Sequence, residues 1–268
     1  FVNEMFGTHH IDMRVSHWSS LDAVNWKRQS TVVDRVPGRS HKNLRSEVWL
    51  TGVKYNEDEQ AWNIFFVSYR GGNGAAGEMA FADYDGRIWR GRSTVKGPDG
   101  IGGPYKDVEI IMQPDKNTQK WEGQQAVDSF NPYQVGDKWY GFYGGHYHHP
   151  CGNWEVGLAV ADKLAGPWKR MPEAFNPVPI VTRFTENPVT SQLPDGRYLA
   201  VFDSLGPCQI GYSISEDGIT WPLETRLTVQ TGANKWVGDG DHNMRTPLSA
   251  VREDDGTFTV IYTAKMKD

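Results

Sequence analysis

The chain has 268 residues, of which 23% are charged and 38% hydrophobic, and its formal net charge is −5. This composition is that of an ordinary globular protein and excludes collagen-like and low-complexity chains. It contains no apolar run long enough for a membrane span, and the acidic balance argues against nucleic acid or an anionic membrane as a partner.

The expected strands are short runs of alternating or aromatic residues bounded by turn residues. In chain order they include 1–5, 62–68, 139–144, 198–202 and 258–263. The last three follow the turn pairs Gly136-Asp137, Asp195-Gly196 and Asp255-Gly256. Such pairs are typical of hairpins. No window shows the spacing of an amphipathic helix, so the pattern predicts an all-β protein.

These runs recur as copies of one larger unit. Trp62, Trp139, Tyr198 and Phe258 take the same place in the repeat and lie 77, 59 and 60 residues apart. A unit of about 60–75 residues with four short strands is typical of a propeller blade, whereas a β-sandwich would give shorter and less uniform repeats. We predict a single five-bladed β-propeller domain whose first and last blades are incomplete. The expected blades span about 1–40, 41–112, 113–175, 176–235 and 236–268.

Three short motifs carry a resemblance to known enzymes. They are VDSFNP at 127–132, GDKWY at 136–140 and GLAVADKLAGPW at 157–168. In this order they resemble five-bladed propeller glycosidases, namely glycoside hydrolase family 43 and its relatives in families 32 and 117. The resemblance implies three carboxylates at the mouth of a central channel, at the starts of the innermost strands of blades one, three and four.

Two of these carboxylates can be placed by their distance from the repeated aromatics. Asp128 lies 11 residues before Trp139, and Glu186 lies 12 residues before Tyr198. The resemblance implies that Glu186 is the general acid and that Asp128 orients it and raises its pKa. The chemistry agrees, because glycoside hydrolysis needs one protonated and one ionised carboxyl group, and two neighbouring carboxylates push one pKa upward. The same count places Thr51-Gly52 and Thr246 at this position in blades two and five.

The third carboxylate, the general base, has no counterpart in the sequence. Counting back by the same interval in blade one leads to a position before Phe1, and Asp12 and Asp22 lie too late in the blade. The expectation is therefore a base upstream of Phe1. The alternative is a non-catalytic propeller that binds glycans or proteins and lacks the base.

A second constellation is GDGDHNMRTP at 238–247. It resembles a Gly-Pro-Gly-His-Asn stretch of family 43, with Asp in place of Pro, whose histidine faces the channel and helps to hold a structural calcium or a water cluster. His242 could therefore ligate a metal, bind a sugar hydroxyl or donate a proton. Arg245 is a candidate for gripping a sugar through its fork of donors.

Further candidates for contact with the sugar are Trp121, Phe130 and His148. Trp121 could stack on a pyranose ring or pack between blades, and His148 belongs to the run HYHH at 146–149. Adjacent side chains in a strand point to opposite faces, which disfavours a metal site in that run. Cys151 and Cys208 could form one disulfide or remain two thiols.

These features together predict an inverting, exo-acting glycoside hydrolase for a plant or algal poly- or oligosaccharide. No cofactor is expected for the chemistry itself, and a calcium ion in the channel would be structural. The expected partner is a carbohydrate, with neither nucleic acid nor membrane involved, and the expected location is secreted or periplasmic. The sequence gives no indication of the oligomeric state.

Overall fold

A computed structural model describes residues 1–5, 13–36, 42–70, 85–123, 127–146, 154–180, 185–204, 209–227 and 244–264. Over these ranges the regular structure is strands, with two short 3-10 helices, η1 (Pro98–Gly102) and η2 (Lys120–Glu122). The all-β prediction is confirmed. Within the described part of the chain, no helix is long and apolar enough to cross a membrane.

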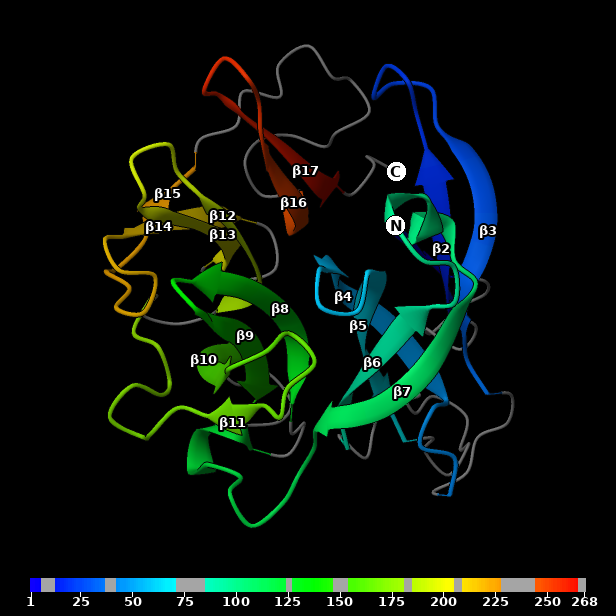
Figure 1. Cartoon of the computed structure of the whole chain (residues 1–268). Coiled ribbons are helices and arrows are strands. Elements are labelled where there is room, and N and C mark those ends of the chain that lie inside the picture. The colour runs from blue at the N-terminus through cyan, green and yellow to red at the C-terminus, as the bar shows by residue number, and fades with distance from the viewer. Residues whose placement is uncertain are drawn as a thin grey trace. The chain divides into compact units, whose positions relative to one another are not determined.

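The strands form five antiparallel sheets that follow one another along the chain (Figure 1). The first sheet contains β1 (Val2–Met5), β2 (Met13–Ser19) and β3 (Lys27–Asp34). The second contains β4 (Glu47–Asn56), β5 (Ala61–Tyr69), β6 (Arg87–Ser93) and β7 (Tyr105–Met112). The third contains β8 (Asp128–Val135), β9 (Lys138–His146), β10 (Trp154–Ala161) and β11 (Lys169–Arg170).

The fourth sheet contains β12 (Thr185–Gln192), β13 (Tyr198–Ser204), β14 (Ile210–Ser215) and β15 (Thr225–Arg226). The fifth contains β16 (Met244–Arg252) and β17 (Phe258–Ala264). The five sheets agree with the expected five-bladed fold class. The limits of the individual blades and their grouping into one domain stay a prediction.

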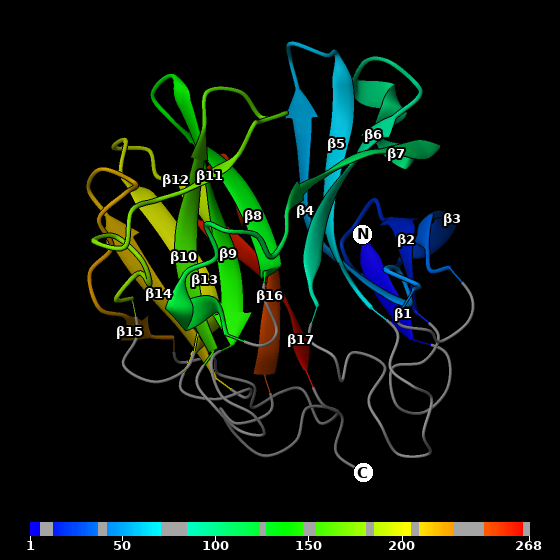
Figure 2. The same cartoon turned by 90° about the horizontal axis from the view of Figure 1, so that it is seen from below.

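The structure divides into two compact units, each described by itself. The first contains Phe1–Thr118, Gln124–Phe130 and Leu164–Trp168. Its core lies between the first two sheets and consists of Val15, Val33, Val48, Ile64 and Phe66. Figure 2 shows β4 and β5, the strands that carry much of this core, side by side.

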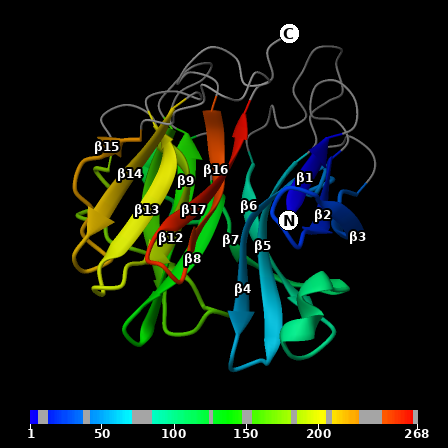
Figure 3. The same ribbon diagram turned by 90° about the horizontal axis from the view of Figure 1, so that it is seen from above.

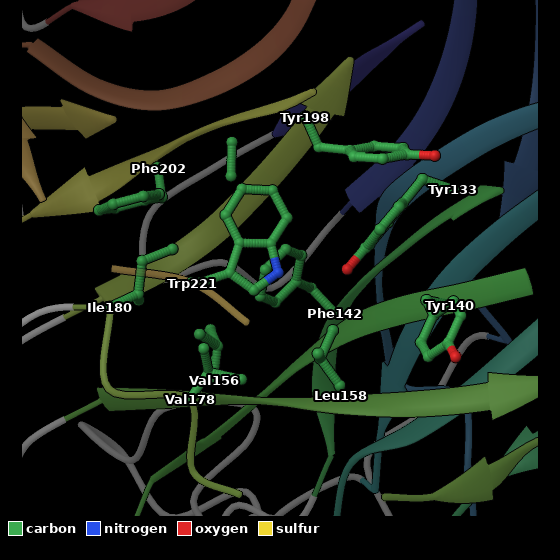
Figure 4. Close-up of a cluster of buried hydrophobic side chains, with 11 residues drawn as sticks. Tyr133, Tyr140, Phe142, Val156, Leu158, Val178, Ile180, Tyr198, Phe202 and Trp221 are labelled. Carbon is green, nitrogen blue, oxygen red and sulfur yellow. The ribbon is translucent and has the colours of Figure 1, made fainter. Parts of the chain in front are cut away.

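The second unit contains Gln119–Gly123, Asn131–Lys163 and Lys169–Asp268. Its main core is aromatic: the rings of Tyr133, Phe142, Tyr198 and Phe202 surround Trp221, as Figure 4 shows. Because these rings come from the third and fourth sheets, the cluster packs the two sheets together. Strands β12, β13 and β14 run side by side in the fourth sheet (Figure 3).

The repeated aromatics mark the same strand in each full copy of the sheet. Tyr198 and Phe258 pair with Gln192 and Arg252, the last residues of the preceding strands, and Trp62 pairs with Tyr55, the last residue but one of β4. Each aromatic is therefore the first or second residue of the second strand of its sheet. The repeat in the sequence therefore marks the hairpin between the first and second strands, which recurs from sheet to sheet.

A shared turn relates the first sheet to the fourth. Asp22 accepts the backbone N–H groups of Val24 and Asn25, and Asp217 accepts those of Ile219 and Thr220. The first turn joins β2 to β3 and the second joins β14 to β15. Strands β1, β2 and β3 thus correspond to the second, third and fourth strands of the four-stranded sheets.

Trp121 lies against two glycines of the third sheet, and this contact leads to a prediction about stability. A Cβ atom at Gly157 would lie 2.4 Å from Trp121 Cζ2 and 3.1 Å from Asn176 Cγ. Overpacking of this kind costs about 1–3 kcal/mol. We expect Gly157→Ala to lower the free energy of unfolding in urea by that amount. Adding Trp121→Phe, which removes the clashing Cζ2 and Cη2 atoms of the indole, should lower the free energy of unfolding by less than the sum of the two single changes. Additive effects would contradict the assignment.

Candidate active site

Both candidate carboxylates stand at the start of the first strand of a sheet. Asp128 opens β8, and Glu186 is the second residue of β12. Glu186 pairs with Asp203, five residues after Tyr198. In the fifth sheet, Thr263 lies five residues after Phe258 and pairs with Arg245. In the second sheet, Val67 lies five residues after Trp62 and pairs with Trp49. The first strands therefore carry Trp49, Glu186 and Arg245 in one register.

This register corrects two positions that counting along the sequence assigned. Arg245 takes the place assigned to Thr246, and Trp49 takes the place assigned to Thr51-Gly52. The reason is that the first strands contain β-bulges, with register shifts between Glu186 and Val189 and on both sides of Pro247. A bulge adds a residue to one strand without a partner on the other, so a fixed interval misses the register.

The residues directly after Asp128, Glu186 and Arg245 share an unusual backbone conformation. The angle φ is 50° at Ser129, 54° at Asn187 and 45° at Thr246. A left-handed conformation is uncommon outside glycine, and for β-branched threonine it is an outlier. Strain of this kind concentrates at functional sites, where the surrounding structure must enforce it. The same backbone conformation therefore follows Asp128, Glu186 and Arg245 in three different sheets.

In the first unit, Asp128 is held by donors on two sides. The Tyr69 hydroxyl donates a hydrogen bond to Asp128 Oδ2, and the Ser129 N–H donates to Oδ1 at 2.5 Å. Asp128 is 7% exposed, and the Tyr69 ring packs edge-on against Trp49, with 5.2 Å between the ring centroids. Donors at both oxygens stabilise an ionised carboxylate and fix its plane.

In the second unit, Glu186 is also 7% exposed, and its cross-strand partner Asp203 is fully buried. Asp203 accepts hydrogen bonds from the Asn187 side-chain amide and the Thr246 N–H, at 2.9 and 2.6 Å. A second carboxylate beside Glu186 is a feature that the sequence reasoning missed. The available signal was its place in the repeat, five residues after Tyr198.

The contact between Asp203 and Thr246 belongs to a recurring arrangement. Near the end of a second strand, a polar side chain bonds the first strand of the next sheet along the chain. Asn3 Oδ1 accepts the Leu50 N–H at 2.9 Å, Tyr69 donates to Asp128, and Asp203 accepts from Thr246. These bonds fix the starts of the first strands, where the candidate carboxylates lie.

The aromatic candidates lie inside their units. Trp121 is 8% exposed, packs on Tyr143 and donates its indole N–H to Gln119 Oε1 at 2.8 Å. Phe130 is fully buried between Phe65 and Trp168, with ring-centroid distances of 5.3 and 4.8 Å. Packing explains both side chains, and neither presents a ring face for stacking within its unit.

The remaining candidates fall outside the described residues. These are His242, His148, Cys151 and Cys208, and of Arg245 the backbone in β16 is described but the side chain is not. Over the ranges that the structure describes, no group of three or more His, Cys, Asp or Glu side chains could hold a metal ion. The role of His242 in metal binding stays a prediction.

The Tyr69 contact leads to a prediction about stability. A hydrogen bond to a charged group contributes about 1.5–3 kcal/mol, and Tyr69→Phe removes this one while keeping the ring. We expect the free energy of unfolding, measured in urea, to fall by that amount. Tyr55→Phe is the matched control, because the Tyr55 hydroxyl bonds Gln60 Oε1 at 3.3 Å at the surface. If both changes lowered the free energy of unfolding equally, the bond to Asp128 would stabilise the protein no more than a hydrogen bond at the surface.

Comparisons with known proteins bear on this arrangement. No protein-family model and no curated protein sequence matches the chain. Solved structures do match. A family 117 glycoside hydrolase from the marine bacterium Zobellia galactanivorans is 16% identical, with a TM-score of 0.61 over 83% of this chain and 58% of that one. The chain thus spans little more than half the length of this enzyme.

Two further matches are an arabinofuranosidase and a xylosidase. An α-L-arabinofuranosidase from Lactobacillus brevis is 13% identical, with a TM-score of 0.59 over 97% of this chain and 79% of that one. A family 43 β-xylosidase/α-arabinofuranosidase from a compost metagenome, with bound xylotriose and in a calcium-free form, is 15% identical, with a TM-score of 0.59 over 85% of this chain and 74% of that one. The chain therefore has the fold of the β-propeller glycoside hydrolases, as its motifs predicted.

Proposed function

We propose that the protein is a glycoside hydrolase that cleaves a plant or algal poly- or oligosaccharide. The observation that carries the proposal is the place of Asp128 and Glu186. Each is a largely buried carboxylate at the start of the first strand of its sheet, followed by a residue with positive φ. In a fold shared with glycoside hydrolases, carboxylates so placed fit the acid and ionised groups of this reaction.

We assign the general acid to Glu186 and the ionised partner to Asp128. The bonds from Tyr69 and Ser129 suit Asp128 to remain ionised, because both oxygens accept hydrogen bonds. Glu186 would donate its proton to the glycosidic oxygen as the bond to the anomeric carbon breaks. In the inverting reaction that we propose, a water molecule attacks from the opposite face and loses its proton to a base.

We also propose a substrate class, a cellular location and a role for a calcium ion. The solved relatives include structures with bound xylotriose and β-1,3-galactotriose, which supports a carbohydrate as partner of this chain. We propose action at a chain end or side chain and a secreted or periplasmic location, where such glycans are met. A calcium ion near His242 would have a structural role, and the calcium-free form of one relative supports the relevance of this ion.

The test is product release from a panel of plant and algal oligosaccharides. The panel contains arabinofuranosides, xylosides, galactosides and anhydrogalactosides, and released sugars are separated by chromatography. Release of one sugar class supports the proposal and names the substrate, and NMR of the fresh product gives its anomeric configuration. Binding without release would instead favour a non-catalytic glycan-binding propeller.

A further inference from the structure

We propose that Asp203 is a positioning residue for Glu186, acting through the bulge that follows it. Asp203 is a fully buried carboxylate on β13, directly opposite Glu186 in the register of the fourth sheet. Residues opposite each other in an antiparallel pair have their Cβ atoms about 4.5–5.5 Å apart. The inference rests on the proposed function, because it concerns how the proposed general acid is held.

The hydrogen bonds of Asp203 reach the two bulges next to it. Its Oδ2 atom accepts the Asn187 amide at 2.9 Å and the Thr246 hydroxyl at 3.4 Å, and its Oδ1 atom accepts the Thr246 N–H at 2.6 Å. Both donor residues have positive φ. One carboxylate thus holds two strained positions, one in β12 and one in β16.

This arrangement bears on Glu186 because Asn187 follows it directly. A residue held at positive φ costs of order 1–3 kcal/mol, so the bulge persists only while its surroundings enforce it. A bulge also re-aims the side chains beside it. If the bond to Asp203 is lost, Asn187 can relax and the Glu186 carboxyl group moves. Small displacements of a catalytic group reduce rates strongly.

A purely structural reading of Asp203 makes a different prediction. If the hydrogen bond between Asp203 in β13 and Thr246 in β16 only stabilised the fold, its loss would reduce the folded fraction. The rate would then fall equally for every substrate. A positioning residue for the acid affects only those substrates whose leaving group needs a proton. The two readings therefore differ in how the rate loss depends on the leaving group.

The experiment compares Asp203→Asn and Asn187→Ala with the unmodified chain. Asn187→Ala removes the amide that Asp203 binds and keeps a residue that is strained at positive φ, so it tests the contact even if Asp203→Asn does not fold. Asp162→Asn is the matched control, because Asp162 is 90% exposed. Each variant is assayed on an oligosaccharide of the sugar found by the panel and on its nitrophenyl glycoside.

We expect kcat on the oligosaccharide to fall about tenfold or more in both variants, while kcat on the nitrophenyl glycoside changes less than about threefold and KM stays the same. Equal losses on the two substrates, or no loss, would overturn the role of Asp203 and leave the proposed function standing. If the unmodified chain releases no sugar from either substrate, the proposed function fails and this inference fails with it.

Discussion

Glu186→Gln is expected to lower kcat on the natural linkage by about 10²–10⁴-fold, the range that general acid catalysis contributes. Gln keeps the size of the side chain but has no acidic proton to give to the leaving oxygen. A sugar alkoxide is a poor leaving group and needs that proton, whereas a dinitrophenolate leaves without it. On a dinitrophenyl glycoside of the same sugar, the loss should therefore be less than about tenfold.

The measurement is kcat for both substrates, with purified variants of equal folded content. Glu216→Gln is the control, since the Glu216 side chain is 82% exposed in the same unit. It should retain full activity on both substrates. A Glu186→Gln variant that cleaves the natural linkage at the normal rate would contradict the assignment of the acid.

The second large effect concerns stability, at the ion pair between Glu122 and Arg170. Arg170 donates from Nε and Nη2 to the two carboxylate oxygens of Glu122 at 2.7 and 2.9 Å, and the two side chains are 8% and 0% exposed. Removing one partner leaves a buried charge without its counter-ion, which costs about 3–5 kcal/mol. We expect Arg170→Met to lower the free energy of unfolding by that amount in urea titrations.

Two variants separate the ion pair from a general effect of losing arginine. Arg197→Met removes an ion pair with Asp195 at 2.8 Å whose side chains are 40% and 51% exposed, and its unfolding midpoint should not move. Combining Glu122→Gln with Arg170→Met leaves neither charge alone and should cost less than the two single changes together. Equal stability losses for Arg170→Met and Arg197→Met would show that burial of the pair has no energetic weight.

Much of the fold could be predicted because it depends on local patterns. The aromatics that open the second strands, and the turn pairs before three of them, repeat with the sheets. Alternating side chains and turn residues are properties of a few consecutive residues, so the sequence shows them directly. The same period placed Asp128 and Glu186 at the starts of first strands, where the structure has them.

The site could be predicted only in part, because its supports come from residues far apart in the chain. Counting back along the sequence from Phe258 assigned Thr246 to the place that Arg245 takes in the sheet. The reason is that a bulge adds a residue to the first strand, and the local sequence pattern does not indicate it. Trp121 was open to stacking or packing, and its burial depends on Gly145 and Gly157. An amino-acid type states what a side chain can do, whereas its exposure depends on which distant residues cover it.

The sequence by itself determined the all-β class and the repeat, and it placed Asp128 and Glu186 at the starts of first strands, since periodicity and spacing are carried by neighbouring residues. Only the tertiary structure decided what holds those carboxylates. Tyr69 reaches Asp128, and Asp203 reaches Asn187 and Thr246. The contacts Tyr69–Asp128 and Asp203–Thr246 join strands of different sheets, and a polar side chain finds such a partner only when packing brings the two backbones together.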